Sequence, residues 1–171
     1  KAAETYQLSL LSEDGEPETL EEARVSLARL VLKASDDQAD LLKDLPADIL
    51  AQARLGEARS YLDDGSAENA LDIYNDILAK TDLPGQTDRS AKSGLAEALS
   101  ALGKHNEASA LWEELLREDL EQRERLHIET LLAYGKLQSS DLKGAQVAFE
   151  SLSRSADEET RIQGILGLAE T

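Results

Sequence analysis

The same arrangement of a turn, an alanine and an aromatic residue occurs three times along this 171-residue chain. In each copy the aromatic residue lies four positions after the alanine, in the pairs Ala70 and Tyr74, Ala108 and Trp112, and Ala145 and Phe149. Both residues recur at steps of 38 and then 37 positions. A nearly constant period of this size is typical of stacked helical hairpins, because each hairpin buries its apolar face only against its neighbours.

Composition indicates that these repeated units are helical. Hydrophobic residues make up 41% of the chain and are mostly Leu and Ala, which favour helices, whereas aromatic residues are only 4%. Two of the three prolines, Pro46 and Pro84, lie between segments of helical periodicity. We therefore predict an all-α fold, an α-solenoid of stacked antiparallel helical hairpins.

The repeat between residues 86 and 119 is the clearest of the set. Leu95, Leu99 and Leu102 lie on one stripe at helical spacing, and Gly103 suits a helix end that needs a left-handed residue. We expect one helical-repeat domain over 1–171, divided into a divergent repeat with an extra short helix at 1–49, repeats at 50–85, 86–119 and 120–155, and the start of another repeat at 156–171.

The turn of the third repeat differs from the other two. The first two turns carry Gly65 and Gly103, but Ser140 stands at the matching position. Two registers are open for this hairpin: the same register as the others, or a shift by one residue that would turn Leu137 inward.

Taken together, these residues resemble the tetratricopeptide repeat (TPR). The repeat at 86–119 matches the TPR motif at Leu95, Ala96, Leu99, Gly103, Ala108, Trp112 and Leu115. The preceding repeat matches at Ala58, Tyr61, Gly65, Ala70, Tyr74 and Ile77, and departs from it at Glu57. The third matches at Leu132, Ala133, Ala145, Phe149 and Leu152, and departs at Lys136 and Ser140. The resemblance is closer over 50–171 than over 1–49, and it implies a right-handed superhelix.

The TPR resemblance implies a concave surface formed by the first helix of each hairpin, where extended peptides or partner helices bind. Carried over, it places Arg59, Leu62, Glu97, Tyr134 and Leu137 on that surface as candidate partner-binding residues. It also places there, in the third and fourth repeats, His127, Thr130, Gln163 and Leu166. Ser93 and Glu97 replace the Lys, Asn or Arg with which chaperone-binding members hold a peptide carboxylate, so we expect a mixed polar and apolar groove instead.

The net charge of −17 restricts the partners. An acidic surface repels phosphate backbones and anionic lipid headgroups, which disfavours binding to nucleic acid or to a membrane surface. It accelerates association with a protein or peptide that carries basic stretches. The same charge is also compatible with a simple solvated surface that has no specific partner.

Catalytic and metal-binding chemistry finds little support. The chain has no cysteine, and its two histidines, His105 and His127, are not at a ligand spacing. The acidic turns at 13–15 and 63–65 lack the alternating acids of a calcium loop. No glycine-rich phosphate motif occurs, and Trp112 fits a core position better than a ligand platform. We therefore predict no catalytic, cofactor-binding or metal-binding residue and no cofactor.

The resulting functional hypothesis is a non-catalytic protein–protein interaction scaffold within a larger assembly protein. The alternatives are a structural spacer or oligomerisation arm, or the regulatory domain of an enzyme whose catalytic part lies outside these residues. The apolar runs are too short to insert into a membrane. Because the chain starts at Lys1 and contains no Met, we expect a piece of a longer protein. A likeness to bacterial cell-envelope assembly proteins favours the periplasm or cell envelope, although the composition does not locate the protein.

Overall fold

A computed structural model describes residues 47–80 and 83–171 of the chain. Within these residues there are seven helices and no strand, which confirms the prediction of an all-α fold. The helices are α3 (Ala47–Asp63), α4 (Ala67–Leu78), α5 (Gly85–Ala101), α6 (His105–Leu115), α7 (Gln122–Gln138), α8 (Leu142–Leu152) and α9 (Glu158–Glu170). Residues 1–46, which hold most of the predicted divergent repeat and its short helix, lie outside the described residues.

Long and short helices alternate along the described chain. The helices α3, α5 and α7 each have 17 residues, and each is followed by a shorter helix of 12, 11 and 11 residues, respectively. We call the long helices and α9 helix A, and we call α4, α6 and α8 helix B. Helix A begins at residues 47, 85, 122 and 158, at steps of 38, 37 and 36. The period of the sequence is therefore the period of a helical hairpin.

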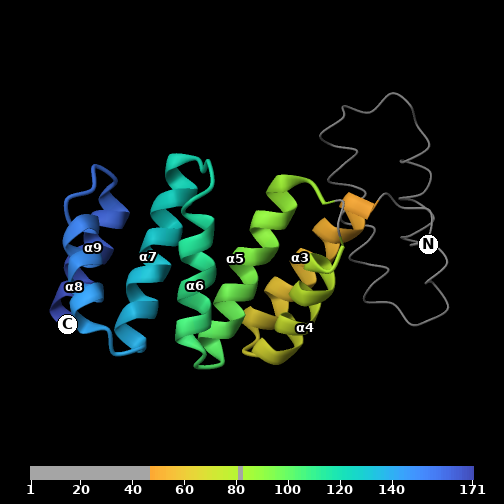
Figure 1. Cartoon of the computed structure of the whole chain (residues 1–171), viewed down its shortest axis with the longest axis horizontal. Coiled ribbons are helices and arrows are strands. Elements are labelled where there is room, and N and C mark those ends of the chain that lie inside the picture. Colours follow the sequence, from red (N-terminus) through yellow and green to blue (C-terminus); the bar gives the residue numbers. More distant parts are fainter. Residues whose placement is uncertain (1–46, 81–82) are drawn as a thin grey trace. The chain divides into compact units, whose positions relative to one another are not determined.

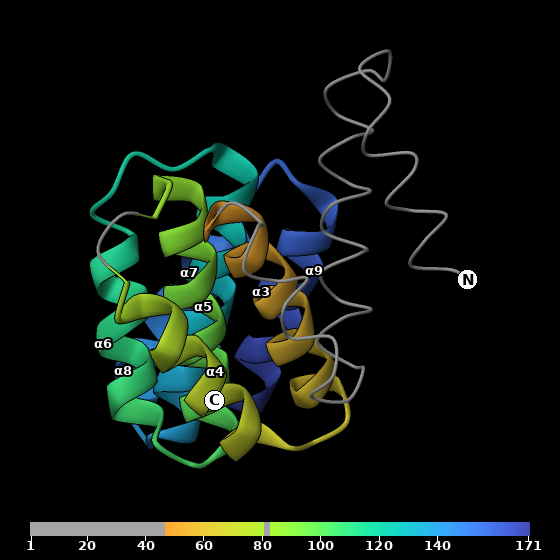
Figure 2. The ribbon, with the colours of Figure 1, turned by 90° about the vertical axis from the view of Figure 1, so that its right-hand side faces the viewer.

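The chain forms two compact units, with the boundary between Ala91 and Lys92 inside α5. In the first unit α3 packs against α4. In the second unit α6 packs against α7, α7 against α8, and α8 against α9, and α7 also contacts α9 (Figure 1). Figure 2 shows α6 and α8 on the same side of the second unit, with α9 on the opposite side. In this view α9 is thus separated from the two helix B copies of the unit.

The repeated alanines and aromatic residues form the core of the hairpins. Ala70, Ala108 and Ala145 are fully buried, and their aromatic partners are at most 3% exposed. Trp112 is 2% exposed, which confirms it as a core residue. An alanine at the contact allows two antiparallel helices to approach closely, and the aromatic ring fills the space beside it.

Each hairpin turns through one residue in the left-handed backbone region. The φ angles of these residues are +78° at Gly65, +77° at Gly103 and +66° at Ser140. The residue after each turn residue donates a hydrogen bond from its backbone N–H to a carbonyl five positions earlier, with N···O distances of 2.7, 2.9 and 2.9 Å. This bond is the helix-ending pattern that favours glycine. The turn of the third hairpin therefore keeps the register of the other two, although Leu137 still packs partly against the buried core of this hairpin.

Replacing Ser140 with glycine should stabilise the protein. A non-glycine residue in the left-handed region costs about 1–2 kcal/mol of folding free energy, and glycine would remove this cost. Glycine also has more conformational freedom in the unfolded chain, which offsets part of the stabilisation. We expect Ser140→Gly to raise the free energy of unfolding by about 0.5–1 kcal/mol, measured by urea denaturation. The control Ser151→Gly, on exposed helical backbone in α8, should lower it by about 0.5 kcal/mol. Equal losses in both variants would contradict this account of the turn.

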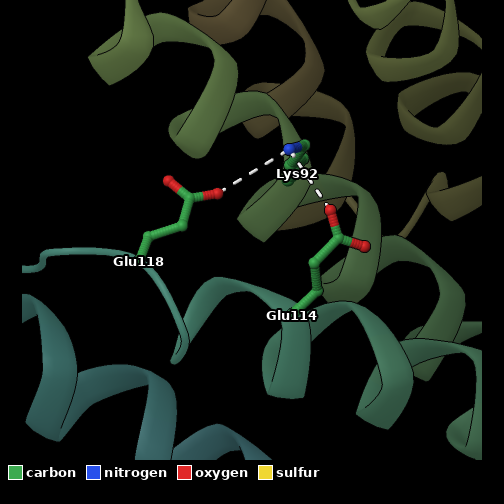
Figure 3. Close-up of polar contacts among 3 residues, drawn as sticks. All are labelled: Lys92, Glu114 and Glu118. Atoms are coloured by element: carbon green, nitrogen blue, oxygen red, sulfur yellow. Dashed lines mark hydrogen bonds and ion pairs between the residues drawn. The ribbon is translucent and has the colours of Figure 1, made fainter.

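An ion pair between helix A and helix B occurs at matching positions in two hairpins. Arg54 Nη1 lies 3.4 Å from Asp76 Oδ2, and Lys92 Nζ lies 3.4 Å from Glu114 Oε1. Figure 3 shows Lys92 pointing toward Glu114 and toward Glu118, whose Oε1 is 3.7 Å from Lys92 Nζ. Exposed pairs of this kind contribute only about 0–1 kcal/mol. These two pairs show which position of helix A faces helix B of the same hairpin.

Candidate functional site

A cleft of about 880 Å³ lies between α7 and α9, within the second compact unit. Its walls come from the N-terminal halves of both helices and from the residue just before each helix. The lining residues are Glu121, Gln122, Arg123, Glu124, Leu126, His127, Thr130, Asp157, Glu159, Thr160 and Gln163. The cleft is thus built where two successive copies of helix A begin.

The two walls of the cleft consist of equivalent repeat positions. The pairs 121 and 157, 123 and 159, and 127 and 163 are each separated by 36 residues, which is the step from α7 to α9. Each wall therefore presents the same face of helix A. A repeat that places equal faces next to each other forms a continuous binding surface along its axis.

The wall formed by α9 begins with a capped helix end. Oδ1 of Asp157 accepts hydrogen bonds from the backbone N–H of Thr160 at 2.8 Å and from its Oγ1 at 2.7 Å. These two bonds lower the pKa of the Asp157 carboxyl below its ordinary value, and the positive charges of Arg123 and Arg161 add to the effect. Asp157 is therefore an ionised carboxylate at neutral pH, and it orients the first turn of α9.

Tyr134 of α7 links the cleft to the buried core. Its hydroxyl donates a hydrogen bond to Oε1 of Gln163 at 3.0 Å. Its ring meets Phe149 edge-on, with the ring centroids 5.0 Å apart and an interplanar angle of 73°. Burial raises the pKa of the phenol, and the negative charge of Glu170 raises it further, so the hydroxyl stays protonated and able to donate. Tyr134 therefore holds the amide of Gln163 in place at the cleft.

The cleft is strongly acidic. Its lining contains four carboxylates, Glu121, Glu124, Asp157 and Glu159, and one guanidinium, that of Arg123. Counting only these Asp, Glu and Arg side chains, the lining charge is −3. Carboxylates gathered around a concave surface favour the approach of a cationic ligand. His127 lies exposed on the α7 wall.

None of the five residues predicted to bind a partner lines this cleft. Arg59 is exposed on α3, where its Nε lies 3.4 Å from Oδ1 of Asp63, and Leu62 is half-buried in the same compact unit. Glu97 is half-buried on α5. Tyr134 and Leu137 pack against a buried cluster of the second unit. Binding by these five residues stays a prediction.

The buried cluster consists of Ala133 on α7 and Ala145, Phe149 and Leu152 on α8. Tyr134 and Leu137 cover part of it, so they contribute to packing whether or not a partner also touches them. Of the wider set expected on the concave surface, His127, Thr130 and Gln163 do line the cleft. These three residues therefore lie on the faces of α7 and α9 that line the cleft.

No sequence pattern predicted the cleft residues in the first turns, above all Arg123, Glu124 and Glu159. Charged residues at helix starts resemble ordinary solvated ends, so they carried no separate signal. A signal was nevertheless present in the repeat step, because advancing 36 positions from 121–127 leads to 157–163, the segment that forms the opposite wall.

Comparisons with protein-family models, with curated proteins and with solved structures found no match to this chain. Over residues 47–80 and 83–171, no helix has both the length and the apolar content needed to cross a membrane. In the same residues no group of three or more His, Asp or Glu side chains is arranged to hold a metal ion.

Proposed function

We propose that this chain is a non-catalytic protein-interaction module of the TPR type, and that an extended polypeptide segment with basic side chains binds between α7 and α9. The observation that carries the proposal is the cleft itself: about 880 Å³, formed by equivalent faces of two helix A copies, with a lining charge of −3. Such a site combines a continuous surface with electrostatic attraction for Lys or Arg side chains.

The remaining polar groups of the cleft suit a peptide backbone. Gln122 and Gln163 carry side-chain amides, which both donate and accept hydrogen bonds. The Gln163 amide is already oriented by the Tyr134 hydroxyl, which reduces the entropy lost when a ligand binds. A peptide backbone presents alternating donors and acceptors to such groups, so the lining can recognise main chain and cationic side chains together.

The hydroxyl groups of the cleft support binding rather than nucleophilic catalysis. Thr130 Oγ1 donates to the carbonyl of Leu126 at 2.8 Å, and Thr160 Oγ1 donates to Asp157 at 2.7 Å. A hydroxyl nucleophile needs a base that takes its proton, and His127 shares no hydrogen bond with either threonine among the contacts of these residues. The cleft is therefore better suited to holding a partner than to reacting with one.

A selection from a random peptide library displayed on phage would test the proposal. We expect the selected peptides to be enriched in Lys and Arg and to shift the amide resonances of α7 and α9 in a titration followed by NMR. The variant Glu121→Lys/Glu159→Lys should weaken their binding about tenfold or more. Raising the salt concentration should slow association, because screening reduces the attraction between the acidic cleft and a basic peptide.

The matched control is Glu68→Lys/Glu107→Lys. It changes the net charge by the same amount, and both residues are exposed in the first turn of a helix B outside the cleft. We expect it to bind the selected peptides nearly as well as the wild type. If the library yields no binder, or if both double variants bind equally, the cleft is not the binding surface and the structural-spacer function becomes the better proposal. Membership of a larger assembly and a location in the cell envelope stay predictions.

A further inference from the structure

The charged side chains of the cleft between α7 and α9 all lie at one of its ends. They belong to residues 121–124 and 157–159, which form the first turns of α7 and α9 and the residue before each helix. The lining further along the two helices consists of Leu126, His127, Thr130, Thr160 and Gln163. None of these side chains carries a negative charge. Because equivalent residues of α7 and α9 pair across the cleft, the cleft has an acidic end and, at these five residues, a neutral end.

The neutral end offers hydrogen-bond donors and apolar surface in place of carboxylates. Oε1 of Gln163 already accepts a hydrogen bond from the Tyr134 hydroxyl, which leaves the two N–H groups of the amide nitrogen to donate. The hydroxyls of Thr130 and Thr160 donate within the protein, and Leu126 adds an apolar side chain. An uncharged side chain therefore suits this end, whereas a cation would meet donors there.

The two ends of the cleft are a few peptide residues apart. Gln163 comes six positions after Asp157, which is about 9 Å along a helix axis. Three residues of an extended peptide span about 10 Å. Side chains bound at the two ends therefore come from residues about three positions apart. The Debye length at physiological salt is about 8 Å, so the carboxylates of the acidic end attract a cation at the neutral end only weakly.

We propose that the cleft selects polypeptide segments that carry a basic residue and, about three positions away, an uncharged residue. The inference rests on the proposed function, because it concerns the same cleft and the same class of partner. A basic side chain gains contacts with carboxylates only at the acidic end. A second basic side chain at the neutral end would lose part of its hydration without gaining a carboxylate, which is unfavourable. The cleft therefore prefers a mixed segment to a uniformly basic one.

Four synthetic peptides test this preference on the whole chain. Each has a four-residue core between Gly-Ser spacers, and the cores are Arg-Ala-Ala-Leu, Leu-Ala-Ala-Arg, Arg-Ala-Ala-Arg and Leu-Ala-Ala-Leu. The two mixed cores cover both chain directions. Affinities are measured by titration followed by NMR at physiological salt. We expect the better mixed peptide to bind at least about tenfold more tightly than the uncharged peptide, and at least as tightly as the doubly basic one.

A substitution at the neutral end should reverse the preference. Gln163→Glu keeps an oxygen that can accept from the Tyr134 hydroxyl and adds a carboxylate at this end. We expect this variant to bind the doubly basic peptide at least about fivefold more tightly than either mixed peptide. The matched control is Gln86→Glu, which makes the same charge change at an exposed residue in the first turn of α5, outside the cleft. It should keep the preference of the wild type.

The outcomes separate this inference from the proposed function. If Glu121→Lys/Glu159→Lys weakens binding but the wild type binds the doubly basic peptide most tightly, the inference is wrong and the proposed function stands. The same holds if Gln163→Glu leaves the order of affinities unchanged. If none of the four peptides shifts the resonances of α7 and α9 while peptides selected from the library do, only the inference is wrong. If the selected peptides fail as well, both are wrong.

Discussion

Replacing Trp112 with alanine should lower the free energy of unfolding by about 3–5 kcal/mol, the largest effect that we expect from any single substitution in this chain. The indole is 2% exposed and stands at the core position that follows the fully buried Ala108. It also lies against Gly135 of α7, where an added Cβ would come within 2.8 Å of Trp112 Cζ3. Its removal would leave a cavity between α6 and α7 that the surrounding helices fill only in part.

The control for this prediction is Trp112→Phe. The Nε1 atom of Trp112 is buried and has no hydrogen-bond partner among the described residues. Phenylalanine removes that unsatisfied donor and keeps most of the apolar volume, so we expect a loss below about 1.5 kcal/mol. Urea denaturation followed by circular dichroism measures both variants. An unchanged midpoint for Trp112→Ala would show that the indole does not hold the two helices together.

Introducing a side chain at Gly164 should have the second-largest effect. A Cβ at this position would lie 2.3 Å from the backbone N of Ser153 and 2.7 Å from the carbonyl carbon of Leu152. Both are backbone atoms at the end of α8, so they can make room only if the helices separate. We expect Gly164→Val to lower the free energy of unfolding by about 3 kcal/mol, at the upper end of the usual cost of overpacking.

The matched control lies on the next residue of the same helix. Ile165 is 55% exposed, so Ile165→Val should change the free energy of unfolding by less than about 0.5 kcal/mol. Separation of α9 from α8 would also displace the wall that carries Asp157 and Gln163. Gly164→Val should therefore lose helical circular dichroism and peptide binding together. Stability equal to that of Ile165→Val would refute the close packing of α8 and α9.

Much of the local structure could be predicted from the sequence. The alanine and aromatic spacing predicted the hairpin period, and the Leu and Ala content predicted helices. Gly103 predicted a helix end because a left-handed residue there is a local requirement. These features depend on interactions within a turn or between adjacent helices. They can therefore be predicted from the spacing of residues along the sequence.

The register of the third hairpin could not be predicted, because Ser140 offers no glycine signal. Tertiary packing decides it. Keeping the common register buries Ala133, Ala145 and Phe149 in one cluster, and burial of this kind outweighs the roughly 1–2 kcal/mol that a left-handed serine costs. A local preference was thus overruled by contacts between residues that lie several positions apart.

The sequence by itself therefore determined that this protein is helical, where its hairpins repeat and which alanines and aromatic residues form its core. Only the tertiary structure decided where its surfaces lie. The structure shows that the ring of Tyr134 packs on Phe149 and that its hydroxyl holds Gln163, while contact of Tyr134 with a partner stays a prediction. Because residue 164 is glycine, α9 lies directly on the backbone of α8, and this packing contributes to the distance between α9 and α7 across the cleft. That distance depends on how the side chains of three helices pack together. It therefore cannot be predicted from the residue pattern of any one of these helices.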